Sequence, residues 1–90
     1  KEKEQLLVDQ LVHPAIVHRN HMGLWMSLQF DSSELTKKIA ATCIQNGIIT
    51  DWFLFAEDRI RIAPPLCITK NELIEAIQVI QKSISQALQD

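Results

Sequence analysis

The hydrophobic residues of this chain change their spacing several times, and the order of these changes restricts the fold more than any other feature. Residues 24–30 alternate with period two, as in a half-buried β-strand. The shared face of that strand carries Leu24, Met26, Leu28 and Phe30. Residues 69–88 instead place apolar side chains three or four positions apart, which is the spacing of an amphipathic helix. The chain therefore combines strands with helices.

The residues before this strand predict a short helix and a further strand. A helical stripe is formed by Leu7, Val8, Leu11 and Val12. Pro14 ends the helix because a proline disfavours helical geometry in the residue before it. The β-branched Ile16 and Val17 favour an extended segment up to residue 21.

Residues 31–47 carry the signals of a second helix. We expect Asp31 to cap its N-terminus and Glu34 to complete a capping box. Phe30 is expected to pack against Leu35 across the start of the helix. Gly47 can adopt a left-handed backbone and end it. The side chains predicted to point inward are Leu35, Ile39, Cys43 and Ile44.

Two or three short strands are predicted next. Residues 48–55 are rich in β-branched and aromatic side chains, and residues 59–62 alternate between arginine and isoleucine. A turn at residues 57–58 joins them. Pro64 and Pro65 stop the second strand because neither can donate a hydrogen bond to a neighbouring strand.

The final helix has the clearest start signal of the chain. Thr69 and Glu72 are spaced as a capping box, and Ile68 can pack against Leu73. The predicted inward stripe is Leu73, Ile77, Ile80, Ile84 and Leu88. The whole order predicts one α+β domain over residues 1–90, with helices on one face of a mostly antiparallel sheet of three to four strands.

Composition excludes several classes of function. The formal net charge is −2 and basic residues cluster little, which argues against nucleic acid as a partner. No apolar run approaches the ~20 residues that cross a bilayer. Cys43 and Cys67 lie in apolar stretches without a metal or disulfide spacing, so we expect reduced, buried thiols in a cytoplasmic protein.

Candidate metal and catalytic groups give weak signals. His13, His18 and His21 are close in sequence, but positions 18 and 21 of a strand point to opposite faces, so we expect solvated or interface histidines rather than a metal site. No serine lies in a glycine elbow, and the chain has no glycine-rich phosphate loop. We therefore predict no catalytic residue. Trp25 and Trp52 are interpreted as core or interface anchors.

The pair Arg59 and Arg61 is more informative. Strand alternation places Ile60 and Ile62 on one face and both guanidinium groups on the other. A guanidinium presents a rigid fork that matches a carboxylate. Arg61 stands beside the rigid proline pair and is the predicted binding residue, whereas Arg59 is interpreted as a solvated charge of the strand.

Three segments together resemble a known family. Residues 61–69 (RIAPPLCIT) with the following KNEL, residues 23–26 (GLWM) and residues 46–49 (NGII) resemble the C-terminal part of class-III pyridoxal-phosphate-dependent aminotransferases, the ornithine, acetylornithine and gamma-aminobutyrate group. The similarity runs from Val17 to Ser85 in the family's order. The first residue is Lys1 rather than methionine, and a helical pattern is already present there, so we expect a piece of a longer chain.

The resemblance implies the small domain of a fold-type-I, homodimeric transaminase that moves an amino group from an amino acid or omega-amine to 2-oxoglutarate. Its large domain would hold the pyridoxal phosphate and the lysine that binds it covalently. None of the six lysines here has that context, so the fragment alone is expected to be inactive. Arg61 matches the family's arginine that grips a substrate carboxylate or pairs with a glutamate of the large domain.

The chain departs from the family pattern in two places. Residues 20–22 (NHM) stand where an arginine and a glycine are usual, and residues 52–55 (WFLF) replace a more polar turn. The amino donor therefore stays open. The alternative hypothesis is a free-standing α+β ligand-binding or regulatory module, because a fold alone does not settle function.

Overall fold

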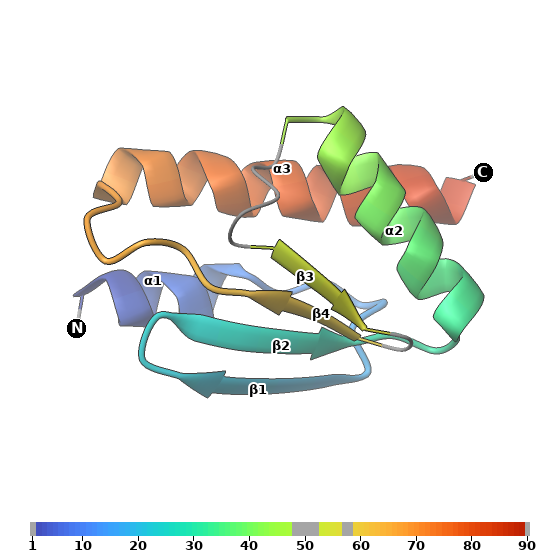
Figure 1. Cartoon of the computed structure of the whole chain (residues 1–90), viewed down its shortest axis with the longest axis horizontal. Helices are drawn as coiled ribbons and strands as arrows, with labels where there is room; N and C mark the ends of the chain where they lie inside the picture. Colours follow the sequence, from blue (N-terminus) through green and yellow to red (C-terminus); the bar gives the residue numbers. More distant parts are fainter. Residues whose placement is uncertain (1, 48–52, 57–58, 90) are drawn as a thin grey trace.

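A computed structural model of the chain describes residues 2–47, 53–56 and 59–89. In chain order the elements are α1 (Glu2–Gln10), β1 (His18–Met22), β2 (Trp25–Gln29), α2 (Ser33–Gln45), β3 (Phe53–Ala56), β4 (Arg59–Ile62) and α3 (Lys70–Gln89). Figure 1 shows the strands as one layer and the helices as a second layer. The expected strand residues 48–52, which include Trp52, and the expected turn at residues 57–58 lie outside the described residues.

The strands form a four-stranded sheet in the order β1-β2-β4-β3, and each neighbouring pair is antiparallel. The chain leaves the sheet after β2, forms α2, and returns through β3 to place β4 beside β2. Residues 15–17, expected to be extended, precede β1, which begins at His18. The α+β class, the antiparallel sheet and the helices on one face are thus confirmed, with four strands.

The core lies between the sheet and the helices. Of the residues predicted to face inward from β2, Met26, Leu28 and Phe30 are buried and Leu24 is half-buried. Ile60 and Ile62 of β4 lie beside them across the sheet, as the register of β2 and β4 requires. The helices and the residues directly beside them contribute the rest of the buried hydrophobic set: Leu7, Leu11, Ile39, Ala40, Cys43, Ile68, Leu73, Ile77, Ile80, Ile84 and Ala87.

The helix α1 is attached by both apolar and polar contacts. Leu7 and Leu11 are fully buried, whereas Val12, predicted to be on the same stripe, is 48% exposed because α1 ends at Gln10. The Arg19 guanidinium donates hydrogen bonds to the carbonyl oxygens of Val8 (2.7 Å) and Leu11 (3.0 Å). These carbonyls lack helical partners, so Arg19 serves as the C-terminal cap of α1.

The start of α2 corrects the predicted cap. Ser32, not Asp31, is the capping residue: its hydroxyl accepts a hydrogen bond from the Leu35 amide at 3.1 Å, and its backbone is extended. Three consecutive residues can cap a helix here, and the structure selects the second of them. With the cap at Ser32, Leu35 occupies the position where a capping box needs Glu or Gln, so Glu34 completes no box.

The buried face of α2 differs from the predicted stripe. Ile39 and Cys43 are buried as expected, but Ile44 is 50% exposed and Thr36 is buried instead. The Thr36 hydroxyl donates to the Ser32 carbonyl at 2.8 Å, which satisfies it inside the core. The helix ends at Gln45, and Gly47 has a left-handed backbone with φ of 98°, as predicted.

The capping box of α3 is confirmed. The Glu72 amide donates to the Thr69 hydroxyl at 3.1 Å, and the Thr69 amide donates to the Glu72 carboxylate at 2.9 Å. The hydrogen bond from the Thr69 amide, and next to it the Thr69 side chain, hold the pKa of Glu72 below its ordinary value, because they stabilise the charged carboxylate. At the other end Leu88, predicted to face inward, is 50% exposed, and Ala87 is buried in its place.

The described part of the chain has no helix that is both long and apolar enough to span a bilayer.

Candidate functional site

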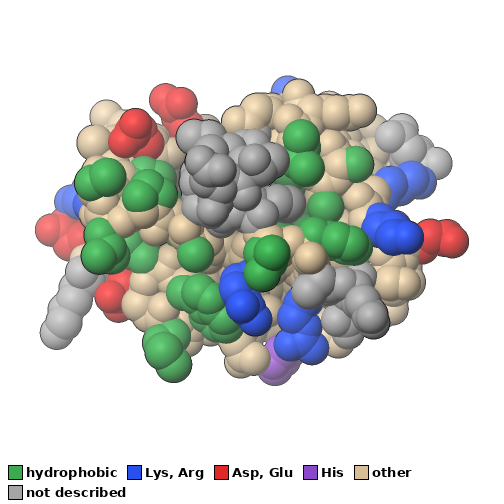
Figure 2. Space-filling model, in the orientation of Figure 1, with side chains coloured by type: hydrophobic (Ala, Val, Ile, Leu, Met, Phe, Trp, Pro, Cys, Tyr) green, Lys and Arg blue, Asp and Glu red, His purple; other side chains and the backbone are tan. Residues whose placement is uncertain are grey.

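The sheet has one face without helices, and this open face carries the candidate site. Strand alternation and the register place its residues: His18, Asn20 and Met22 from β1, Trp25, Ser27 and Gln29 from β2, Leu54 and Ala56 from β3, and Arg59 and Arg61 from β4. The other residues of the same strands, such as Leu28 and Ile60, face the core. The sheet therefore has one apolar face that the helices cover and one mixed face that they leave open (Figure 1). Figure 2 shows basic and hydrophobic side chains together over the strands.

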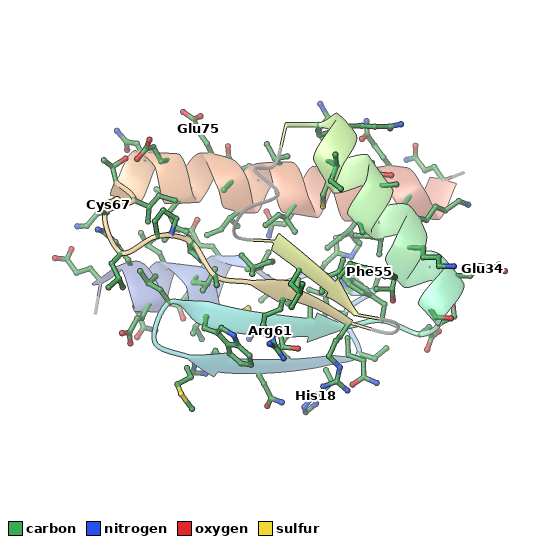
Figure 3. All side chains as sticks on the ribbon, viewed as in Figure 1. His18, Glu34, Phe55, Arg61, Cys67 and Glu75 are labelled. Carbon is green, nitrogen blue, oxygen red and sulfur yellow. The ribbon has the colours of Figure 1, made fainter. Side chains whose placement is uncertain are left out.

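Arg61 lies in the middle of the open face. It is exposed, whereas Ile60 and Ile62 on either side of it are 1% exposed. Across the sheet it stands opposite Ser27 of β2 and Leu54 of β3. Figure 3 shows its side chain in front of the strands, on the side away from α3. The predicted position of this guanidinium, displayed on the face opposite the helices, agrees with the structure.

Arg61 contacts the ring of Trp25. The guanidinium carbon of Arg61 lies over the Trp25 ring, 5.0 Å from its centroid, which is within the range of a cation–π contact. The two residues lie on the same face because Trp25 is two positions from Ser27, which pairs directly with Arg61. Trp25 is half-buried, although no helix covers it. Trp25, interpreted from the sequence as a core or interface anchor, thus contacts Arg61 on the open face.

No carboxylate of the described residues forms an ion pair with Arg61. The described acidic side chains lie on α1, α2 and α3 and at Asp31, and none belongs to the open face. The described ionisable residues of that face are His18, Arg59 and Arg61. The face therefore combines cationic groups with exposed apolar side chains such as Met22 and Leu54, which are 78% and 54% exposed. Such a surface is suited to a carboxylate or an acidic partner.

The described lysines do not lie on this face. The described ones, Lys3, Lys37, Lys38, Lys70 and Lys82, all belong to helices. Lys3 donates to the Leu66 carbonyl, and Lys70 pairs with Glu2. Pyridoxal phosphate is held covalently through a lysine. The described residues therefore do not by themselves make a complete site for it.

The histidines take separate positions. The His13 ring accepts a hydrogen bond from the Ala15 amide at 3.0 Å and lies 3.0 Å from the Ser85 hydroxyl of α3. His18 is on the open face (Figure 3), and His21 pairs with Met26 on the other face of the sheet. Within residues 2–47, 53–56 and 59–89, no group of three His, Cys, Asp or Glu side chains could hold a metal ion.

The two cysteines differ. Both are free; Cys43 is buried as predicted, whereas Cys67 is exposed, because β4 ends at Ile62 and Cys67 lies in the loop after the prolines. Burial raises the pKa of the Cys43 thiol to about 11, against the weaker opposing effect of a hydrogen bond with Ser83. Cys43 is therefore a protonated core residue at neutral pH and not a nucleophile.

A second charged region lies at the end of the sheet near α1. A surface pocket of about 530 Å³ lies there, near Gly23 and Leu66. Its charged lining is Glu2, Lys3, Glu4 and Lys70. The hydrogen bond from Lys70 and, next, its charge lower the pKa of Glu2, so these two groups neutralise each other. This region ties α1 to the start of α3 and contributes no group to the open face.

Among known proteins, this chain is similar to transaminases. The chain is 26% identical over 68 residues to the diaminobutyrate–2-oxoglutarate transaminase of Wolinella succinogenes, covering 76% of this chain and 16% of that protein. No protein-family model matches. The chain thus spans about a sixth of the length of this curated relative.

Solved structures show the same fold. A thermostable (S)-enantioselective omega-transaminase from Thermomicrobium roseum matches 97% of this chain with a TM-score of 0.81 and 22% identity, over 22% of its own length. A pyridoxal-phosphate-bound aminotransferase mutant from Vibrio fluvialis matches 98% of this chain with a TM-score of 0.80 and 17% identity, over 21% of its length. The resemblance to transaminases is confirmed, and the fold is one that these enzymes contain as a part.

Proposed function

We propose that this chain is the C-terminal small domain of a class-III, pyridoxal-phosphate-dependent aminotransferase, and that its open face forms one wall of the substrate pocket. The observation that carries the proposal is Arg61. It is exposed on the uncovered face, rests on Trp25, and has no carboxylate partner among the described residues. This occurs in a fold that transaminases share. An oriented guanidinium without an internal partner is suited to bind a carboxylate from outside the domain.

The role of Arg61 is to bind and orient. Its fork can donate two parallel hydrogen bonds to one carboxylate, which fixes both the position and the plane of that group. Correct placement of a substrate lowers the entropic part of the barrier. In the proposed reaction the carboxylate belongs to 2-oxoglutarate, the acceptor named for the Wolinella succinogenes relative. The donor is an amino acid or omega-amine of the ornithine, acetylornithine or diaminobutyrate kind.

Pyridoxal phosphate would supply the electron sink for amino-group transfer when bound to the full protein. Structures of the Vibrio fluvialis aminotransferase are described with this cofactor and with its amino form bound. Because the described lysines lie on the helices, the covalent cofactor lysine is assigned to a large domain outside these 90 residues. The part played by this chain is the binding of substrate and the exclusion of water on one side.

The proposed partners follow from the open face. We propose that the large domain of the same chain covers it, since Met22 and Leu54 are exposed there beside the arginine. The full enzyme is proposed to be a cytoplasmic homodimer that uses amino and keto acids as substrates.

Kinetics of Arg61→Lys in the full-length protein test the proposal. Lysine keeps the charge but loses the fork, so KM for 2-oxoglutarate should rise about 10- to 100-fold and kcat should fall. KM for an uncharged aldehyde acceptor should change less than about 3-fold. Arg59→Lys, on the same strand and face, is the matched control and should resemble the wild type. Unchanged 2-oxoglutarate kinetics in Arg61→Lys would refute the role.

The reading frame upstream of residue 1 distinguishes the aminotransferase domain from the alternative, a free-standing module. A large domain with a lysine in the cofactor-binding context is expected there. A start codon close to residue 1, with no such domain, would favour the module instead.

A further inference from the structure

The contact between Trp25 and Arg61 bears on which substrate the open face would select. We infer that Trp25 is a positioning residue that makes Arg61 selective for a dicarboxylate, by holding the guanidinium over the indole ring before the ligand arrives. The inference rests on the proposed function of Arg61 and adds the residue that sets its geometry. Trp25 itself is not assigned any contact with the substrate.

Among the described neighbours of Arg61, Trp25 is the one that contacts its guanidinium. The residue opposite Arg61 on β2 is Ser27, whose side chain is too short to cover a guanidinium, and the residue opposite on β3 is Leu54, which offers no acceptor. No described carboxylate pairs with Arg61. Its remaining partner in the described part is the Trp25 ring at 5.0 Å. Ser27 is only 8% exposed although no helix lies over it, as expected if these larger neighbours shield it.

A ring contact orients an arginine without using its hydrogen-bond donors. The attraction is to the flat face of the guanidinium, whereas the N–H groups point outward in its plane. A carboxylate partner would instead occupy two of those donors. Arg61 is therefore both restrained and able to bind a carboxylate. Restraining a side chain before binding reduces the entropy that the ligand must overcome.

The neighbouring side chains explain why the restraint favours a dicarboxylate. Beside Arg61 the open face is apolar at Leu54 and Met22, and its other ionisable described residues are His18 and Arg59. A ligand whose distant carboxylate meets the oriented fork gains from Trp25, whereas an acceptor without that carboxylate has nothing for Arg61 to bind. Trp25 should thus affect affinity for dicarboxylates and leave neutral acceptors unaffected.

A double-mutant cycle in the full-length enzyme tests this inference. Affinity for glutarate, a non-reacting dicarboxylate, is measured by isothermal titration calorimetry. Trp25→Leu should weaken binding about 3- to 20-fold, and Trp25→Phe, which keeps an aromatic face, less than about 3-fold. In the Arg61→Ala background Trp25→Leu should change affinity less than about 2-fold, because the contact is already lost. Leu88→Met, on α3 away from the open face and 50% exposed, is the matched control and should bind like the wild type.

The outcomes separate the two proposals. Suppose that Arg61→Ala weakens glutarate binding. If Trp25→Leu then has no effect, or if it weakens binding equally with Arg61 and with Ala at position 61, the positioning role of Trp25 is refuted and the role of Arg61 stands. If Arg61→Ala has no effect, both fail. Circular dichroism checks the fold of each variant. Trp25→Met is a second variant without a ring, so the cycle can be completed if the leucine variant does not fold.

Discussion

The two faces of the sheet are built from the same strands and yet have different chemistry. On the covered face Met26, Leu28, Ile60 and Ile62 are at most 1% exposed and pack against helices. On the open face the alternate positions carry Trp25, Arg61 and Leu54, and helices leave them uncovered. The covered face explains why the chain folds. The open face has no such explanation within the described residues, and that difference is what points to a partner outside them.

Substitutions in the core should show the difference between the two faces most strongly. Leu28 is fully buried on β2, so Leu28→Ala should lower the free energy of unfolding by about 2–5 kcal/mol. Leu54→Ala makes the same chemical change on the open face, where the side chain is 54% exposed, and should cost less than about 1 kcal/mol. Urea denaturation of the 90-residue chain measures both.

The contrast between these two leucines is the informative quantity. Equal losses would mean that the open face stabilises the domain as much as the core does, and the comparison of the faces would then be wrong. A loss confined to Leu28 would support it.

A smaller effect is expected at the start of α3. The pKa of Glu72 is lowered by its bonds with Thr69, so the folded state favours the charged form. The resulting stability is present at neutral pH and is lost as pH falls through the lowered pKa. Glu72→Gln should therefore be less stable than the wild type near pH 7, with the difference shrinking from about pH 5 to about pH 3. Urea denaturation at several pH values measures it; a difference that does not depend on pH would contradict the assignment.

The sequence was sufficient for the fold class because each local signal agreed with the next. The alternation at residues 59–62 placed Arg61 opposite the isoleucines, and the Thr69–Glu72 spacing located the start of α3 to the residue. Both depend on interactions between residues that are close in the chain, which a single sequence displays directly.

The failures share a physical cause. Ile44 and Leu88 are predicted to face inward because they are apolar, but Thr36 and Ala87 are buried instead. A small or satisfied polar residue allows helices to approach closely, and hydrophobicity alone does not reveal this. At α2, Asp31 and Ser32 are both good capping residues, so local chemistry does not distinguish them, and the structure uses Ser32.

The support of Arg61 by Trp25 could not be predicted from the sequence. Strand alternation put each side chain on its face, but their contact requires β4 to lie next to β2, although α2 and β3 come between them in the chain. That adjacency is a property of the sheet order. The carboxylate that we propose as the ligand of Arg61 lies outside the described residues, so the sequence of this chain does not identify it.

A crystal structure of the full-length protein with glutarate bound tests the central claim most directly. The account predicts a carboxylate of glutarate in two hydrogen bonds with the Arg61 guanidinium, at about 2.7–2.9 Å, with the open face lining the pocket. A glutarate bound elsewhere, with Arg61 in solvent or sealed against polypeptide remote from the ligand, would contradict it.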